Sequence, residues 1–259
     1  MKLRLTLFTL LVPSLLWAQK HQARFDAIDV QHYRFELQLS DETDMIYGTA
    51  QVTIKFKKDL EQFDLDLVNI ADGKGMKVLD VSQDAESLGF SHQNDLLSIS
   101  TSAKAGETHS YNIEYEGIPQ TGLIIAENKF GDRTFFGDNW PDRGKHWLPM
   151  VDHPSDKATV EWMLIAPTQY RVIGSGNLVE ITGVGNGTQI THWKNEVPLP
   201  TKVMVMGAAL FAVEKSGEVE GKEISSWVYP QNEKEGFYDY APAAQITQWF
   251  VDHIAPFPF

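Results

Sequence analysis

Apolar and polar residues alternate along much of the chain with a period of two. Between residues 33 and 39 every odd position is apolar and every even position is polar, and segments 50–56, 63–67 and 111–115 repeat the pattern. Successive side chains of a strand point to opposite faces of a sheet, so each segment predicts a strand with one face in a core. The apolar positions are Tyr33, Phe35, Leu37, Leu39, Ala50, Val52, Ile54, Phe56, Phe63, Leu65, Leu67, Tyr111, Ile113 and Tyr115.

Turn-forming residues separate these segments. Runs rich in glycine, asparagine and aspartate occur at residues 71–75, 93–95 and 183–187. Many short strands divided by such turns are typical of an antiparallel sandwich or saddle of sheets. We therefore expect an all-β fold over most of the chain.

The pattern changes near the C-terminus. Residues 224–229 predict one more strand, and the following apolar residues are spaced as on one face of a helix. Asp239 is expected to cap this helix, Pro242 to lie in its first turn, and Pro256 and Pro258 to end it. The apolar face consists of Ile246, Trp249, Phe250 and Ile254.

The N-terminus has the features of a secretory signal peptide. Lys2 and Arg4 precede a mostly apolar run at residues 5–17, and Ala18 offers a small residue for cleavage. The run is short for a bilayer-spanning helix, although an uncleaved anchor is the alternative. We predict a signal peptide at 1–18, a secreted or periplasmic mature protein, and no integral membrane span after cleavage.

Composition narrows the classes of function. The chain has 22 Lys and Arg against 35 Asp and Glu, a net charge of −13. Such a charge repels phosphate backbones, so no nucleic-acid partner is expected. The absence of cysteine from the 259 residues excludes disulfides, thiolate zinc sites and cysteine nucleophiles.

Common catalytic motifs do not occur in the sequence. It contains no H-E-x-x-H zinc motif, no G-x-S-x-G, no Walker loop and no G-x-G-x-x-G. His146 and His153 flank a proline-containing loop, where they either meet at a metal or form ordinary structural hydrogen bonds. The second interpretation is the more common one for isolated histidines.

Residues 135–149 combine aromatic, acidic, basic and turn-forming side chains, a composition that predicts a loop rather than core. Aromatic rings beside Asp138 and Asp142 suit a ligand with an apolar side chain and a cation. The alternative is an edge loop held by charges of the Asp142–Arg143 and Asp152–Lys157 pairs.

Four ordered segments carry a resemblance to a known family. Residues 147–159, WLPMVDHPSDKAT, resemble the F-P-C-x-D-x-P-x-x-K-A-T/x-F signature of the zinc aminopeptidases related to aminopeptidase N and leukotriene hydrolase. Residues 172–178 resemble the family's V-x-S-N-G-x-L, and residues 199–208 its P-x-P-T-Y-L-x-A-x-A strand. Residues 256–259, PFPF, resemble its P-F-P-Y segment. Together the segments cover nearly the whole mature chain.

The resemblance implies a fold and also implies where the zinc-binding motifs lie relative to these 259 residues. It implies a saddle-shaped, antiparallel β-sandwich N-terminal domain at 19–215, and a short β/α start of an incomplete thermolysin-like catalytic domain at 216–259. The family's G-x-M-E-N and H-E-x-x-H motifs follow the P-F-P-Y segment, so the sequence is expected to stop before the zinc site. The full-length family enzyme uses zinc, whereas these 259 residues are expected to bind none and to be inactive alone.

The resemblance also implies a substrate-binding loop. The family's N-terminal domain carries a Q-x-E-A loop that helps to hold the free α-ammonium of a peptide, and its Gln and Glu align with Asp138 and Trp140. Because tryptophan replaces the glutamate, the carboxylate role does not carry over directly. We predict Asp138, Asn139 and Trp140 as substrate-binding residues, with Asp138 offering the negative charge and Trp140 a wall.

Three functional hypotheses remain open at the level of sequence. The chain is the N-terminal portion of a secreted zinc aminopeptidase that removes N-terminal residues from peptides, a non-catalytic peptide-binding module, or one half of a split peptidase. The expected partners are peptide substrates and the missing catalytic domain. We favour the first hypothesis, because a chain that stops within a family motif is difficult to select for.

Overall fold

The computed structural model describes residues 22–257, in which strands far outnumber helices. The predicted signal peptide at 1–18 lies outside the described residues. The all-β prediction is confirmed, and every apolar residue of the alternating segments is buried. Alternation was therefore a reliable guide to which face of each strand lies in the core.

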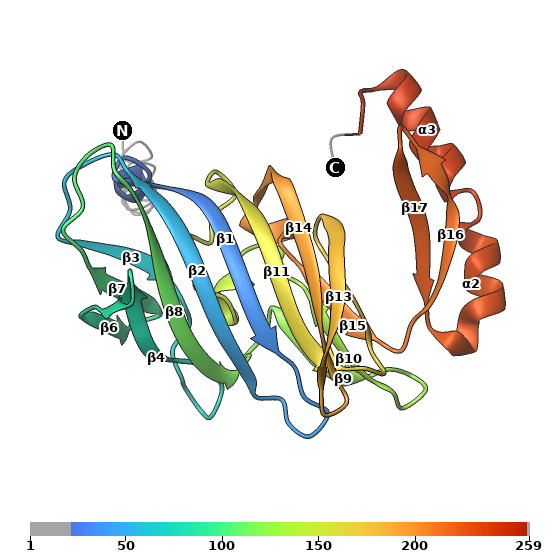
Figure 1. Ribbon diagram of the computed structural model, residues 1–259, viewed down its shortest axis with the longest axis horizontal. Coiled ribbons are helices and arrows are strands. Elements are labelled where there is room, and N and C mark those ends of the chain that lie inside the picture. Colours follow the sequence, from blue (N-terminus) through green and yellow to red (C-terminus); the bar gives the residue numbers. More distant parts are fainter. Residues whose placement is uncertain (1–21, 258–259) are drawn as a thin grey trace, which may run out of the picture.

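An eight-stranded, open and twisted sheet forms the main layer (Figure 1). Its spatial order is β13-β14-β11-β1-β2-β8-β4-β5. Its strands, in chain order, are β1 (Ile28–Gln38), β2 (Ile46–Phe56), β4 (Gly75–Gln83), β5 (Glu86–Ser87), β8 (Thr108–Ile118), β11 (Lys157–Pro167), β13 (Asn177–Gly185) and β14 (Thr188–Pro200).

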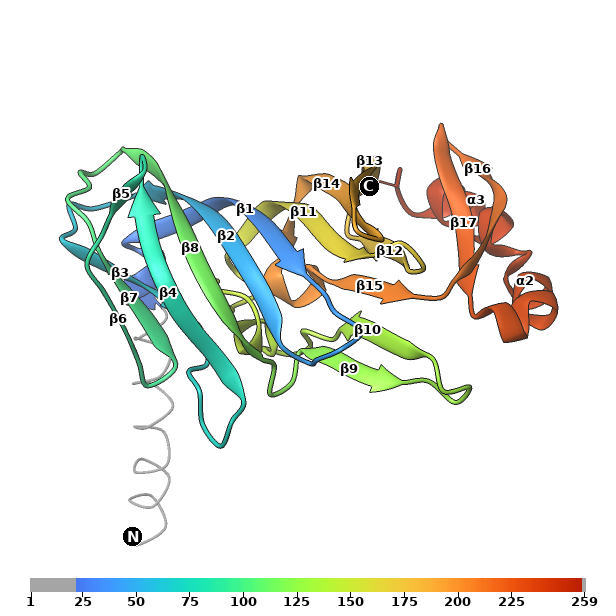
Figure 2. The same cartoon turned by 60° about the horizontal axis from the view of Figure 1, so that its bottom comes forward.

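Two smaller sheets lie at opposite ends of the long sheet (Figure 2). The first has the order β3-β7-β6 and the second β12-β15-β10-β9. The strands are β3 (Gln62–Asp66), β6 (Phe90–Gln93), β7 (Leu96–Ser100), β9 (Leu123–Glu127), β10 (Arg133–Gly137), β12 (Arg171–Gly174) and β15 (Met206–Ala209). Short 3₁₀ helices lie at η1 (Gly144–His146), η2 (Thr201–Val203) and η3 (Pro230–Asn232).

The core lies between these layers and is rich in aromatic side chains. Trp147 and Trp162 stack with ring centroids 6.0 Å apart, and Phe35 packs on Trp162 at 5.2 Å. One pairing differs from the expected antiparallel arrangement, because β1 and β11 run parallel. A period of two fixes the buried face of a strand but carries no information about the direction of its neighbour.

A two-stranded hairpin and two helices follow the sheets. β16 (Ala212–Val219) pairs with β17 (Lys222–Val228), which confirms the predicted strand near 224–229. β16 runs across the domain boundary that we predicted between residues 215 and 216. α2 (Glu233–Tyr240) and α3 (Ala243–His253) pack on the hairpin, on the side away from the long sheet (Figure 1).

The helix prediction needs one correction. Asp239 lies inside α2 and caps nothing, whereas α3 begins at Ala243 after Pro242. α2 was missed because Gly236 and the charged residues give it no apolar stripe. Among the described residues, neither helix is long and apolar enough to cross a bilayer.

Candidate functional site

The segment between β10 and β11, residues 138–156, contains the three predicted substrate-binding residues. It is not the surface loop that its composition predicted, because Trp147, Leu148, Met150 and Val151 are fully buried. These apolar side chains alternate with polar ones too irregularly to be recognised as core from the sequence. Their burial fixes the backbone of the segment and thereby the direction of its polar side chains.

Asn139 is an internal anchor of this segment. Its side chain is 1% exposed, and its Nδ2 donates to the carbonyl oxygens of Thr201 at 3.2 Å and Met204 at 2.8 Å. The indole N–H of Trp147 donates to Asn139 Oδ1 at 2.8 Å. The structure therefore gives the Asn139 amide a supporting position, while its predicted contact with substrate stays a prediction.

Asp138 and Trp140 lie on the surface on either side of Asn139. Asp138 is part-exposed and forms an ion pair with Arg143, with 2.8 Å between Oδ2 and the guanidinium nitrogen. Trp140 is 59% exposed, and the Lys202 ammonium lies over its ring at 4.4 Å from the centroid. Sequence analysis named Arg143 only as a partner of Asp142, and it missed Lys202, which is 62 positions away from Trp140.

A cleft of about 570 Å³ opens beside this segment. Trp140, Pro141 and Leu96 supply apolar wall, and the other lining residues are mostly charged. The charged side chains of the wall are Arg24, Asp66, Asp95, Asp142, Lys145, Asp152 and Lys202. A cleft with an exposed aromatic ring and charges of both signs suits a zwitterionic ligand such as a peptide end.

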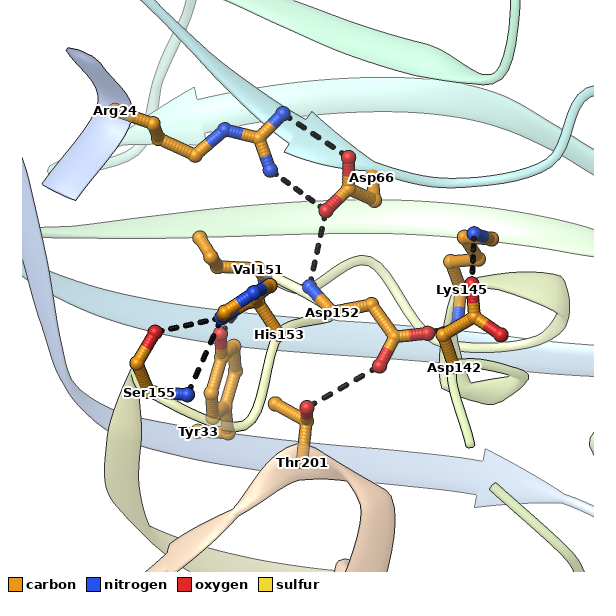
Figure 3. Close-up of polar contacts among 10 residues, drawn as sticks. All are labelled: Arg24, Tyr33, Asp66, Asp142, Lys145, Val151, Asp152, His153, Ser155 and Thr201. Carbon is orange, nitrogen blue, oxygen red and sulfur yellow. Dashed lines mark hydrogen bonds and ion pairs between the residues drawn. The ribbon is translucent and has the colours of Figure 1, made fainter. Parts of the chain in front are cut away.

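Asp152 is the polar centre of the cleft wall (Figure 3). Its carboxylate accepts hydrogen bonds from the Lys145 backbone N–H at 3.1 Å and the Thr201 hydroxyl at 3.2 Å. Burial raises the pKa of Asp152 to about 6, although these bonds act in the opposite direction. The Asp152 backbone N–H donates to Asp66 Oδ2 at 2.9 Å.

Arg24, near the N-terminal end, holds the Asp66 carboxylate in position. Its guanidinium binds both oxygens of Asp66, at 2.6 and 3.0 Å (Figure 3). A bidentate pair between part-buried groups holds its geometry better than a single contact. Neither residue was singled out by sequence, because they are 42 positions apart and belong to no motif.

The ion pairs differ from those expected for an edge loop. Lys145 binds Asp142 at 3.1 Å and Arg143 binds Asp138, rather than Asp142 with Arg143. Asp152 contacts Lys145 N–H and Thr201, rather than Lys157. Asp142 and Arg143 lie in the turn that precedes η1, where their side chains pair with Lys145 and Asp138 instead of with each other.

The two histidines considered for a metal do not form such a site. His153 Nδ1 contacts the Ser155 hydroxyl at 2.6 Å, and burial lowers the pKa of His146. Between residues 22 and 257, no group of three His, Asp or Glu side chains could hold a metal ion. The described residues therefore do not fit the zinc site implied by the family, and no step of metal chemistry is assigned to them.

Comparison with known proteins places this fold in a class. The family model described as the Peptidase M1 N-terminal domain matches residues 29–203. This range includes the long sheet, the segment 138–156 and the cleft-lining Lys202. The chain belongs to the peptidase M1 N-terminal domain family.

Solved structures show the same fold at low sequence identity. An M1 zinc metallopeptidase from Deinococcus radiodurans matches with a TM-score of 0.72 and 19% identity, over 90% of this chain and 54% of that one. A mutant of that enzyme bound to a Tyr-Ser-Ala substrate matches with a TM-score of 0.71 and 20% identity, over 90% and 55%.

Leukotriene A4 hydrolase from Saccharomyces cerevisiae matches with a TM-score of 0.73 and 18% identity, over 89% of this chain and 36% of the hydrolase. The chain thus spans about half the length of the Deinococcus enzyme and about a third of the yeast one. The matched portion includes the region after residue 203, because it extends over about nine-tenths of the chain.

Proposed function

We propose that this chain is the N-terminal portion of a secreted, zinc-dependent aminopeptidase that removes N-terminal residues from peptides. The observation that carries the proposal is the family match over residues 29–203, supported by the M1 fold. In this proposal the chain supplies scaffold and a wall of the substrate site, and the zinc ligands belong to the catalytic domain of the longer enzyme.

The proposed wall is formed by Asp138 and Trp140. A peptide α-ammonium would pair with the part-exposed Asp138 carboxylate, in competition with or alongside Arg143. The exposed Trp140 ring would pack against the first side chain of the peptide, as aromatic rings do at specificity pockets. Asn139 would hold both residues in place from the interior.

The proposed contact with the catalytic domain lies at the other end of the molecule. Ile246, Trp249, Phe250 and Ile254 on and after α3 are each at least half exposed. Exposed apolar patches of this kind mark surfaces that pack against another part of a protein. The catalytic domain of the longer enzyme is the partner that the family relationship supports.

The test of the proposed wall uses the longer enzyme and an aminoacyl-4-nitroanilide substrate. Asp138→Ala is expected to raise KM about tenfold with little change in kcat, because an ion pair to the α-ammonium is lost from ground and transition states alike. Trp140→Ala is expected to raise KM more for substrates with a large first residue than for substrates that begin with alanine. Asp44→Ala is the control, since Asp44 is an exposed aspartate that is likewise paired with an arginine, Arg133, at 2.6 Å.

Two results would count against this function. An unchanged KM for Asp138→Ala, with the Asp44→Ala control also unchanged, would remove Asp138 from the site. Coding DNA beyond codon 259 that encodes neither G-x-M-E-N nor H-E-x-x-H would remove the peptidase assignment itself. In that case unrelated downstream sequence would favour the peptide-binding module, and a neighbouring gene that encodes the missing half would favour the split peptidase.

A further inference from the structure

Residues 22–27, which precede β1 and are here called the N-terminal strap, lie against the segment 151–156 that leads into β11. Arg24 ties the strap to Asp66, and the Phe25 ring lies 5.0 Å from the His153 ring. From the other side, the Lys57 ammonium donates to the Phe25 carbonyl oxygen at 2.9 Å. These contacts, together with the hydrogen bond from the Lys57 N–H to the Ala27 carbonyl oxygen at 2.8 Å, hold the strap closed over this part of the molecule.

Asp156 lies beneath the strap with its carboxyl group out of solvent. The residue is 6% exposed and accepts a hydrogen bond from the Val30 backbone N–H. Its second oxygen, Oδ2, is buried and accepts no hydrogen bond from any residue between 22 and 257. A carboxylate with an unsatisfied buried oxygen is costly, whereas the protonated acid is tolerated at much lower cost.

The groups around Asp156 act on its ionisation in both directions. Burial is the largest cause and raises the pKa of Asp156 to about 7, and the Asp29 carboxylate acts in the same direction. The Val30 N–H, Lys57 and Arg24 act in the opposite direction. The Tyr33 phenol and the His153 ring also face this region from β1 and from the segment 151–156.

We propose that the N-terminal strap is a proton-controlled cover: it stays closed over Asp156 while that carboxyl is protonated and opens when the carboxyl ionises. Ionisation places a second negative charge beside Asp29, on the carboxyl of a residue that is 6% exposed and whose Oδ2 accepts no hydrogen bond from the described residues. Lifting the strap hydrates the carboxylate and so weakens its repulsion with Asp29, which stays in β1 opposite Lys55 of β2. The bidentate Arg24–Asp66 pair limits how far the strap opens.

The opening would change a wall shared by two cavities. A cavity of about 440 Å³ is lined by Gln22, Phe25, Asp29, Lys57, His153 and Asp156. His153 also lines the cleft that contains Trp140. A strap that releases Phe25 from His153 therefore couples proton concentration to the shape of the cleft, independently of whether the cleft binds peptides.

The test measures hydrogen exchange at the edge of the strap in the full chain between pH 5.5 and 8.0. The Lys57 amide reports directly, because it donates to the Ala27 carbonyl oxygen of the strap at 2.8 Å and loses this bond when the strap lifts. After correction for intrinsic exchange, its protection is expected to fall about thirtyfold over this range. This factor is the proton linkage of a carboxyl whose pKa changes from about 7 in the closed state to its ordinary value in the open state. Protection in the middle of β2 should stay constant.

Asp156→Asn is expected to abolish this dependence, because the amide cannot ionise. Asp26→Asn, which changes an exposed aspartate of the same strap, should keep it. An equal fall of protection in Asp156→Asn and in the unaltered chain would overturn the proposal. If Asp156→Asn does not fold, the carbon-13 carboxyl resonance of Asp156 in the unaltered chain decides: a titration midpoint below pH 5, or one that differs from the midpoint of strap opening, contradicts the proposal.

Discussion

Single buried polar groups determine how the segment 138–156 presents its surface residues. The Asn139 side chain joins three parts of the chain, since it contacts Trp147, Thr201 and Met204. Each of these hydrogen bonds satisfies a polar group that is buried away from water. Asp138 and Trp140 are thus positioned by the residue between them.

Replacing Asn139 with alanine is expected to destabilise the fold by about 3 kcal/mol, because the Trp147 N–H loses its acceptor and two carbonyl oxygens lose a donor. Urea unfolding followed by tryptophan fluorescence measures the change. Asn177→Ala on the exposed strand β13 is the control and should stay within about 0.5 kcal/mol. Equal stability of the two variants would show that the Asn139 amide is not an anchor.

Two buried carboxyls make stability depend on pH. The pKa of Asp152 is raised to about 6 and that of Asp156 to about 7, in both cases mainly by burial. The folded chain therefore keeps protons that the unfolded chain releases, so the stabilisation is complete below about pH 4 and is lost as pH rises through 6 and 7.

The free energy of unfolding is accordingly expected to fall by a few kcal/mol between pH 5 and pH 8. Urea titrations at the two values measure the difference. Asp59→Asn should leave it unchanged, because Asp59 is exposed and its pKa is lowered by hydrogen bonds, so it titrates below this range. A chain that is more stable at pH 8 than at pH 5 would contradict the assigned burial of Asp152 and Asp156.

At the scale of residues the sequence predicted the candidates but not how each one is buried. The family resemblance drew attention to Asp138, Asn139 and Trp140 together, yet only the fold separates the buried amide from its exposed neighbours. Arg24 and Asp66 could not be paired from the sequence, because their contact depends on how β3 and the N-terminal turn meet. Contacts between distant positions of this kind leave no local pattern.

At the scale of elements, alternation predicted well which residues form strands, but it did not predict which strands pair or in which direction. The residues expected in the core are buried, but the parallel β1–β11 pair joins strands that are more than 100 positions apart. A parallel pair needs a long connection, and here the connection contains β2 to β10, including the whole β3-β7-β6 sheet. Local periodicity cannot reveal such a crossover.

Close backbone approaches within the long sheet give a test at this scale. Gly117 in β8 lies between β2 and β4, and a Cβ there would be 2.1 Å from the Gly75 carbonyl oxygen. Backbone cannot rotate away, so Gly117→Ala is expected to cost about 1–3 kcal/mol or more. Gly183→Ala in β13 is the control, because its Cβ would meet nothing within 4 Å.

Thermal or urea unfolding of the two glycine variants measures the difference. The control should stay within about 0.5 kcal/mol of the unaltered chain. If both variants unfold at the same temperature or urea concentration as the unaltered chain, β8 does not approach β4 as closely as described.

At the scale of the whole molecule, the sheets and the C-terminal elements differ in how much surface they bury. The long sheet and its two smaller neighbours share one core. α2 and α3 contain no fully buried residue, and Trp249 and Phe250 are about half exposed. Each large side chain left in water forgoes roughly 1.5–3 kcal/mol, which is large beside a typical net stability of about 5–15 kcal/mol.

Residues after about 216 are therefore expected to exchange their amide hydrogens faster than β1, β2 and β8. Hydrogen exchange of the 259-residue chain, read segment by segment, measures this directly. In the longer enzyme the amides of these same residues should exchange more slowly, because the proposed catalytic domain covers α3. Protection of the tail equal to that of the central strands in the isolated chain would contradict this assignment.

The central claim is that these 259 residues form the scaffold and a docking wall of an M1 peptidase rather than its zinc centre. The most direct measurement combines zinc content with amino-acid release from aminoacyl anilides, on the purified chain with added zinc and with its fold verified by cooperative unfolding. We predict a folded protein with no stoichiometric zinc and no turnover. One tightly bound zinc per chain, with steady release of free amino acids, would contradict the account.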